Sequence, residues 1–219
     1  MAANAAGLDF SGYYKVFLMQ RECMRRIKLS DLEILFDFWI EIPLYGYNRD
    51  HAIRFELHDR YPDNIDKLFG FFCDLYGDAF KNDNVVIIRQ YDRCCKVGSI
   101  SKLIGKQVKP MLRIDFTSKS DKDYYEQDRT SQIYVVKKDQ INLQKIFNAI
   151  FYEKHDSELF FVDPETKTVL NMYDDRGIDI ISKDRRILLQ LYDKYSDWIL
   201  EFNRDEIVNT LFGKKIADS

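Results

Sequence analysis

Three carboxylates and one guanidinium stand close together in the segment Asp174-Asp175-Arg176-Gly177-Ile178-Asp179. Carboxylates at this spacing can hold a divalent cation, act as acid and base, or form an acidic lip that binds a partner. The same residues also suit a structural hairpin. Gly177 can adopt the positive φ of a tight turn, and Arg176 can pair with Asp179 across it. Both interpretations stay open at this point.

A second candidate is Arg54, in the alternating stretch 53–57. Alternation places Arg54 and Glu56 on one strand face and the apolar residues on the other. That face is either simply exposed, or it places Arg54 in a groove where it reaches a carboxylate or phosphate. Tyr173 adds an aromatic side chain of a kind that is common at interfaces. The candidate binding residues are Arg54, Tyr173, Asp174, Asp175, Arg176 and Asp179.

The segment 93–113 contains basic residues and no acidic one: Arg93, Lys96, Lys102, Lys106, Lys109 and Arg113. It could form a patch for a phosphate group or an acidic partner, or a solvated face balanced by the acidic residues of 121–128. It is not a phosphate-binding loop. Too many residues separate Gly98 from Gly105, and Gln107 rather than Ser or Thr follows Lys106.

Motifs of metal sites and catalytic centres are absent from the sequence. His51 and His58 are separated by an odd number of positions, so a continuous strand would send them to opposite faces. No metalloprotease, Cys-x-x-Cys, EF-hand or nucleophile-elbow pattern occurs. We therefore predict no metal, no cofactor and no catalytic residue, and we favour a protein that is not an enzyme.

The cysteines are Cys23, Cys73, Cys94 and Cys95. Their irregular spacing argues against a disulfide framework and favours reduced thiols over a strained bond between Cys94 and Cys95. Together with the lack of a secretory signal, this predicts a cytoplasmic protein.

Sequence patterns predict helices and strands in the first part of the chain. A capping box at 30–33 begins a helix that ends near residue 41. A strand follows over 52–57, then a helix from residue 64 to Gly77, and a buried strand over 85–88. The polar stretch 117–130 suggests a long loop, followed by a strand over 132–136 and a helix capped by Asp139.

The C-terminal part predicts an antiparallel meander of strands over 159–162, 168–173 and 178–181. The turn 163–166 contains Pro164, which fixes φ at a turn position. Ser182 is expected to cap the next helix, and Asn203 to begin the last one. The sum is an α+β fold with a mostly antiparallel sheet and helices packed against it.

The composition is that of a globular protein. The chain has 219 residues, 46% of them hydrophobic, and a net charge of −3. No apolar run is long enough to span a bilayer. We expect a single α+β domain over 1–219, with an N-terminal extension over 1–28 and the polar loop over 117–130.

Several blocks together resemble a bacterial family known only as domain of unknown function 3885. The resemblance runs from about residue 51 to the C-terminus, apart from 94–130, and is carried by the segments 52–57, 173–181, 191–195, 197–200 and 203–204. The family implies a bacterial, soluble, single-domain protein and supplies no activity or catalytic residues.

Two functions follow from these observations. The favoured one is a cytoplasmic protein-binding module without enzymatic activity, with an immunity protein that neutralises a toxin as one form of it. Its protein partner is expected to offer a basic patch. The alternative is an enzyme or ligand-binding domain that uses Arg54 and segment 93–113 on a phosphorylated compound or nucleic acid.

Overall fold

A computed structural model describes residues 15–17, 44–57, 64–94, 98–104, 108–119, 126–152 and 157–213. The helix predicted over 30–41 lies outside these residues. No helix in the described ranges is long and apolar enough to cross a membrane.

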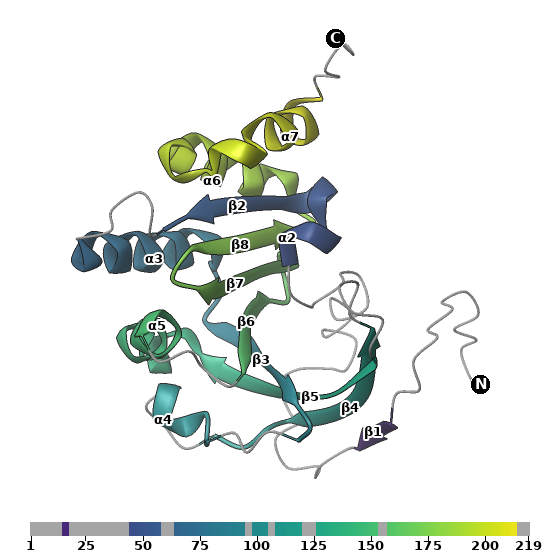
Figure 1. Ribbon diagram of the computed structural model, residues 1–219. Coiled ribbons are helices and arrows are strands. Elements are labelled where there is room, and N and C mark those ends of the chain that lie inside the picture. The colour runs from purple at the N-terminus through teal and green to yellow at the C-terminus, as the bar shows by residue number, and fades with distance from the viewer. Residues whose placement is uncertain are drawn as a thin grey trace.

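An antiparallel sheet organises the chain (Figure 1). Its strands are β1 (Lys15–Phe17), β2 (Ala52–Glu56), β3 (Asn84–Asp92), β4 (Leu112–Lys119), β5 (Glu126–Lys137), β6 (Glu158–Asp163), β7 (Thr168–Asp174) and β8 (Gly177–Ser182). Among the described residues the sheet is eight-stranded, in the order β1-β4-β5-β3-β6-β7-β8-β2. The predicted meander of β6, β7 and β8 is confirmed, and so is the α+β class.

The helices of the described part are α2 (Leu44–Tyr47), α3 (Ile65–Ala79), α4 (Ser101–Ile104), α5 (Leu143–Tyr152), α6 (Arg185–Tyr195) and α7 (Glu201–Phe212), with 3₁₀ turns η2 (Arg49–His51), η3 (Lys138–Gln140) and η4 (Ser196–Trp198). Figure 1 shows α6 and α7 beyond the edge formed by β2, and α3 and α5 beside the sheet. The sheet therefore has helices both against it and at its β2 edge.

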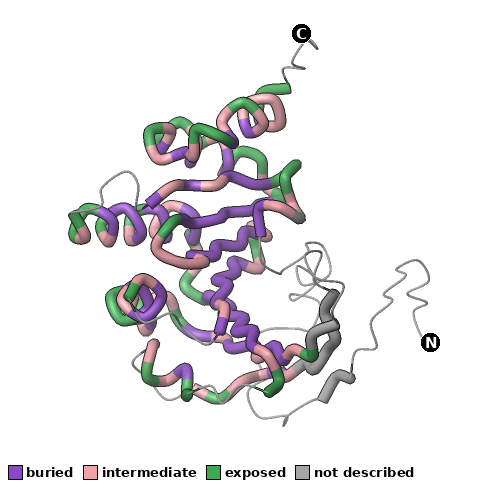
Figure 2. Tube along the Cα trace, in the orientation of Figure 1, coloured by how far each residue is buried: buried purple, intermediate pink, exposed green. Residues whose placement is uncertain are grey.

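The core lies between the sheet and the helices. Phe55 of β2 meets Phe71 of α3 at a centroid distance of 5.7 Å, and Tyr76 of α3 meets Phe161 of β6 at the same distance. The central strands are buried along most of their length (Figure 2). Edge-on ring contacts and burial of this kind stabilise the layer that holds β6, β7 and β8 in place.

The polar stretch 117–130 is not a loop throughout, contrary to our expectation. Residues 117–119 end β4 and residues 126–130 begin β5, with Thr117 paired to Asp128 and Lys119 to Glu126. Strand pairing is made by backbone groups, which every residue except proline supplies in full. A polar composition therefore did not exclude a strand.

Helix boundaries also differ from the predictions. Gly77 lies inside α3, which continues to Ala79. The side chain that caps the start of α5 is Asn142, which accepts the Lys145 N–H at 2.9 Å, while Asp139 lies in η3. In each case the apolar stripe located the helix, and the end differs from the predicted one by two or three residues.

The last two helices show the same difference. Asp184, not Ser182, caps α6 by accepting the Arg186 N–H at 2.9 Å. Helix α7 begins at Glu201, so Asn203 lies inside it and is buried. The predicted turn chemistry after β6 is present, since Asp163 accepts the Glu165 N–H at 3.0 Å.

Gly177 is required for space, not for its backbone conformation. Within the described residues, positive φ occurs at Lys167 and Gly213, so the positive φ expected at Gly177 is wrong. A Cβ atom on Gly177 would instead collide with the Tyr173 hydroxyl and lie 2.5 Å from the Phe55 carbonyl oxygen. Only glycine allows these two groups to approach the start of β8.

We predict that Gly177→Ala lowers the free energy of unfolding by about 1–3 kcal/mol, because backbone and ring must move apart. Urea unfolding measures the change. Gly70→Ala is the matched control, since a Cβ there meets no atom within 4 Å. Because position 70 is exposed in a helix, Gly70→Ala should raise the free energy of unfolding by about 0.5–1 kcal/mol. Equal effects of the two substitutions would contradict the steric explanation.

Candidate functional site

Arg54 and Asp179 form a bidentate ion pair across neighbouring strands. They are opposite each other in the register of β2 and β8. Arg54 donates from Nε to Oδ1 at 2.7 Å and from Nη2 to Oδ2 at 2.8 Å. The Asp179 side chain is completely buried, and its Oδ2 also accepts the Tyr45 N–H at 2.9 Å. The carboxylate that Arg54 reaches therefore belongs to this chain.

Two tyrosine rings flank the guanidinium of this pair. Arg54 Cζ lies 5.0 Å from the centroid of the Tyr45 ring and 5.2 Å from that of Tyr173. Burial raises the pKa of the Asp179 carboxyl, and the hydrogen bonds from Arg54 and Tyr45 oppose that rise. The pair is saturated by its own neighbours, so Arg54 and Asp179 hold the scaffold beneath the site.

The β7–β8 turn carries the remaining predicted residues. Asp174 accepts the Arg176 N–H and the Arg176 Nε, both at 2.8 Å. Arg176 thus pairs with Asp174, and the predicted Arg176–Asp179 pair is wrong. The Arg176 side chain is 76% exposed, so this pair lies at the surface and stabilises little.

A gap opens where β6 and β7 part. Their pairing ends with Phe160 opposite Asn171, although β6 continues to Glu158 and β7 to Asp174. The Asn171 Nδ2 donates to the Leu159 carbonyl oxygen at 2.9 Å, so a side chain bridges the strands at this point. The register of β7 against β8 shifts between Met172 and Asp174. Such a bulge bends a strand and redirects its side chains.

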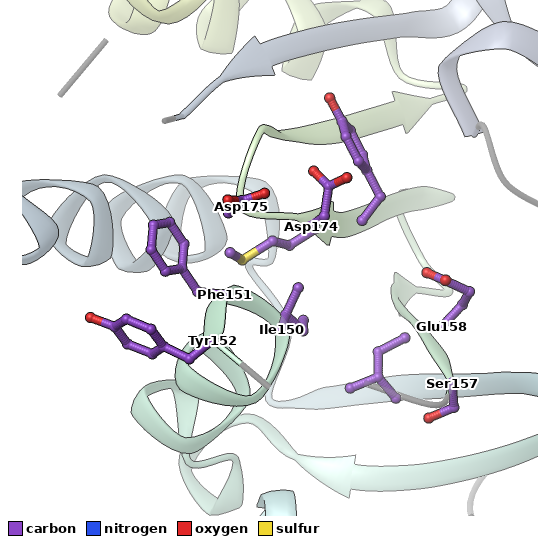
Figure 3. A pocket seen from close by; sticks show the side chains of 10 residues that line it. Ile150, Phe151, Tyr152, Ser157, Glu158, Asp174 and Asp175 are labelled. Carbon is purple, nitrogen blue, oxygen red and sulfur yellow. The ribbon is translucent and has the colours of Figure 1, made fainter. Parts of the chain in front are cut away.

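The gap contains a pocket of about 470 Å³ between β6, β7 and the end of α5 (Figure 3). It is lined by Ile150, Phe151, Tyr152, Ser157, Glu158, Leu159, Met172, Tyr173, Asp174 and Asp175. Three of the six residues predicted for the site, Tyr173, Asp174 and Asp175, therefore line one pocket. Arg54 and Asp179 lie beside Tyr173, outside it.

Glu158 and Asp175 give the pocket its negative charge. Within the described part of the chain, neither carboxylate has a hydrogen bond or an ion pair. Burial raises the pKa of Glu158 to about 7, Arg129 opposes this rise, and Asp174 adds to it. A carboxyl group whose pKa is shifted to near neutral is typical of binding and catalytic sites.

The side chains of Ser157, just before β6, and of Glu158, its first residue, point in different directions, as Figure 3 shows. The Ser157 hydroxyl accepts a hydrogen bond at 2.8 Å from Nε of Arg89, which is buried in β3. Arg89 also donates to the Gly98 carbonyl oxygen at 2.5 Å. This fixed start of β6 determines where the Glu158 carboxyl group stands.

Glu158 and Tyr152 were missing from the residues predicted for the site. A signal for Glu158 existed, because it is the one charged residue at the start of a strand whose next four residues are apolar. Tyr152 ends α5 and is 61% exposed, which no pattern in the sequence indicated.

The pocket can bind a cation but does not form a recognisable metal centre. The described residues contain no group of three His, Cys, Asp or Glu side chains placed to hold a metal ion. Carboxylates beside aromatic and apolar walls instead suit an organic cation with a nonpolar stem.

The basic segment 93–113 is partly neutralised within the described residues. Arg93 pairs with Asp128 at 3.1 Å, which supports the interpretation of a face balanced by acidic residues. Lys102 and Lys109 are exposed, whereas Lys96 and Lys106 lie outside the described ranges.

The antiparallel sheet with helices against it defines an α+β protein. The carboxylate-bearing pocket between β6 and β7 is its candidate binding site. The chain belongs to the family described as "Domain of unknown function (DUF3885)", which matches residues 31–203. The match includes the whole pocket and the Arg54–Asp179 pair.

A curated relative, "Uncharacterized protein YnaE" of Bacillus subtilis (strain 168), is 38% identical over 45 residues. That segment is 20% of this chain and 21% of the relative, so the chain spans about a fifth of the protein it matches. No solved structure matches the chain significantly.

We predict that Arg54→Met lowers the free energy of unfolding at pH 7 by about 3–5 kcal/mol, because the Asp179 carboxylate stays buried without its guanidinium. Urea unfolding measures the loss. In the double variant Arg54→Met/Asp179→Asn the buried group is neutral and can still accept the Tyr45 N–H. It should therefore be more stable than the single variant, and the reverse order would contradict a buried ion pair.

A second prediction concerns Glu158 and pH. The folded pKa, about 7, lies above the ordinary value for glutamate of about 4.3. The folded state therefore holds this proton more tightly than the unfolded state, and stability is lost as pH rises from about 4 through 7. Glu158→Gln removes this loss. Its free energy of unfolding should therefore exceed that of the wild type by about 1–3 kcal/mol at pH 8 and equal it at pH 4.

The measurement is urea unfolding of both proteins at the two pH values. Glu165→Gln, in the exposed turn after β6, is the matched control. Its free energy of unfolding should stay within about 0.5 kcal/mol of the wild-type value. A Glu158→Gln variant that is less stable than the wild type at pH 8 would show that the carboxylate has a favourable partner.

Proposed function

We propose that this chain is a bacterial, cytoplasmic protein-binding module without enzymatic activity. Its contact surface is the β7–β8 turn and the pocket beside it, and its partner is a protein that presents a basic patch. One observation carries the proposal: Glu158 and Asp175 are carboxylates with no hydrogen bond or ion pair among the described residues, in a pocket beside the exposed ring of Tyr152.

A partly buried carboxylate without a partner is costly in the free protein, because water solvates it incompletely. A positive side chain from a partner would remove that cost on binding. Tyr152 and Arg176 add an aromatic ring and a guanidinium at the rim, both of which are common anchors in interfaces. Charge complementarity would also speed association.

The bacterial setting is supported by the relative in Bacillus subtilis. The cytoplasm is supported by Cys73 and Cys94, which are free thiols. Within the class of small bacterial binding modules, an immunity protein that neutralises a toxin is the most specific form of the proposal, by analogy of class.

The alternative, a domain for phosphorylated compounds or nucleic acid, has less support. It relies on segment 93–113, where Arg93 is paired with Asp128, and on Arg54, which is paired with Asp179. These pairs reduce the positive charge available to a phosphate.

The test uses the variant Asp174→Asn/Asp175→Asn. The tagged protein captures its partner from lysate of the organism that encodes it, and calorimetry measures the dissociation constant of the purified pair. We expect the double variant to bind about tenfold more weakly or worse, because two carboxylates at the contact surface are lost. A partner that is toxic when expressed alone would identify the immunity type.

The matched control is Asp193→Asn/Asp197→Asn, which removes the same charge at exposed positions of α6 and η4. It should leave the dissociation constant within about twofold. An unchanged constant in the Asp174→Asn/Asp175→Asn protein, or an equal loss in the control, would overturn the contact surface.

A further inference from the structure

The pocket combines a nonpolar wall with charge. Ile150, Phe151, Leu159 and Met172 supply apolar surface, and Glu158 and Asp175 supply carboxylates from two different strand ends. A ligand that fits must place a nonpolar stem along the first group and a positive charge at the second. Long basic side chains have this form, because their methylene stems pack on apolar surface while the charged end remains polar.

Arginine matches the pocket better than lysine. A guanidinium is planar, weakly hydrated, stacks on aromatic faces and donates two parallel hydrogen bonds to a carboxylate. An ammonium group is strongly hydrated and binds as a point charge. Entry into a partly buried site beside aromatic rings therefore costs a guanidinium less.

The chain's own Arg54 places a guanidinium beside one of the residues that line the pocket. Arg54 is bidentate on Asp179 and lies 5.2 Å from the centroid of the Tyr173 ring, and Tyr173 also lines the pocket. At the rim, the largely exposed Arg176 pairs with Asp174. Both guanidinium groups lie on the β7–β8 side of the gap, each bound to a carboxylate, and that of Arg54 also lies beside a tyrosine ring.

We propose that the pocket between β6, β7 and the end of α5 receives an arginine side chain of the protein partner, with Glu158 as its principal acceptor. The proposal rests on the function proposed above and names the chemistry that the contact surface recognises.

Binding of this kind depends on pH. The groups that act on Glu158 are Arg129 from β5, which favours its ionised form, and Asp174 from β7, which opposes it. Burial keeps the pKa of Glu158 near 7, and a guanidinium binds the ionised carboxylate. Affinity should therefore fall as pH drops from about 8 to 6.

The probe is Nα-acetyl-arginine methylamide, titrated into the full ¹⁵N-labelled chain while amide shifts are followed by NMR. We expect saturable shifts at residues 157–159 and 172–175, with a dissociation constant in the millimolar range, as expected for so small a ligand. The Nα-acetyl-citrulline methylamide is neutral and nearly isosteric, and it should produce no saturable shift. The lysine analogue should bind several-fold more weakly.

Glu158→Gln should weaken arginine binding about tenfold or more, whereas Glu165→Gln should leave it unchanged. Loss of folding would not explain this result, since Glu158→Gln is expected to be at least as stable as the wild type. Citrulline binding as tightly as arginine, or an unchanged affinity in Glu158→Gln, would overturn the proposal. Equal affinity for lysine would overturn the choice of arginine.

The outcomes separate this inference from the proposed function. If the arginine probe does not bind but Asp174→Asn/Asp175→Asn weakens the partner, the pocket inference fails and the contact surface stands. If the probe binds with the expected pattern but Asp174→Asn/Asp175→Asn leaves the affinity for the partner unchanged, the pocket binds arginine as inferred and the proposed function fails at this surface.

Discussion

The buried ion pair of Arg54 and Asp179 is the interaction on which the rest of the site depends. It fastens β2, from the first part of the chain, to β8 from the last meander. The Tyr45 N–H on Asp179 attaches α2 to the same point, and the Tyr173 ring rests on the guanidinium. Tyr173 in turn approaches the start of β8 so closely that Gly177 is required there. A residue pair that the sequence marked for binding thus positions the pocket from outside it.

Much of the fold follows from local patterns. The meander of β6, β7 and β8 could be predicted because apolar strands and the Asp163 turn lie next to one another in sequence. The stretch 117–130 could not, since pairing of β4 with β5 is a backbone interaction that polar side chains do not reveal. Helix ends were missed for a related reason. Several polar residues near each helix start can act as its cap. At α6 the Ser182 hydroxyl is bonded to Thr168 of β7, and Asp184 is the cap.

The site was predictable in part. The turn aspartates Asp174 and Asp175 stand out as a charged cluster, and they do line the pocket. The position of Glu158 before an apolar strand was visible in the sequence, but its burial in a pocket was not, because the pocket arises where β6 and β7 part. Arg176 and Asp179 have opposite charges and near positions, yet each pairs elsewhere, since strand register outweighs closeness along the chain.

The hydrogen bond from Asn171 to the Leu159 carbonyl oxygen has a consequence for the place where the sheet opens. Where two strands are joined by backbone hydrogen bonds, the distance between them is the same whatever their side chains. Next to the last backbone pair, Phe160 and Asn171, an amide side chain makes the link to Leu159 instead. A residue without an amide donor at position 171 would remove this link at the point where β6 and β7 part.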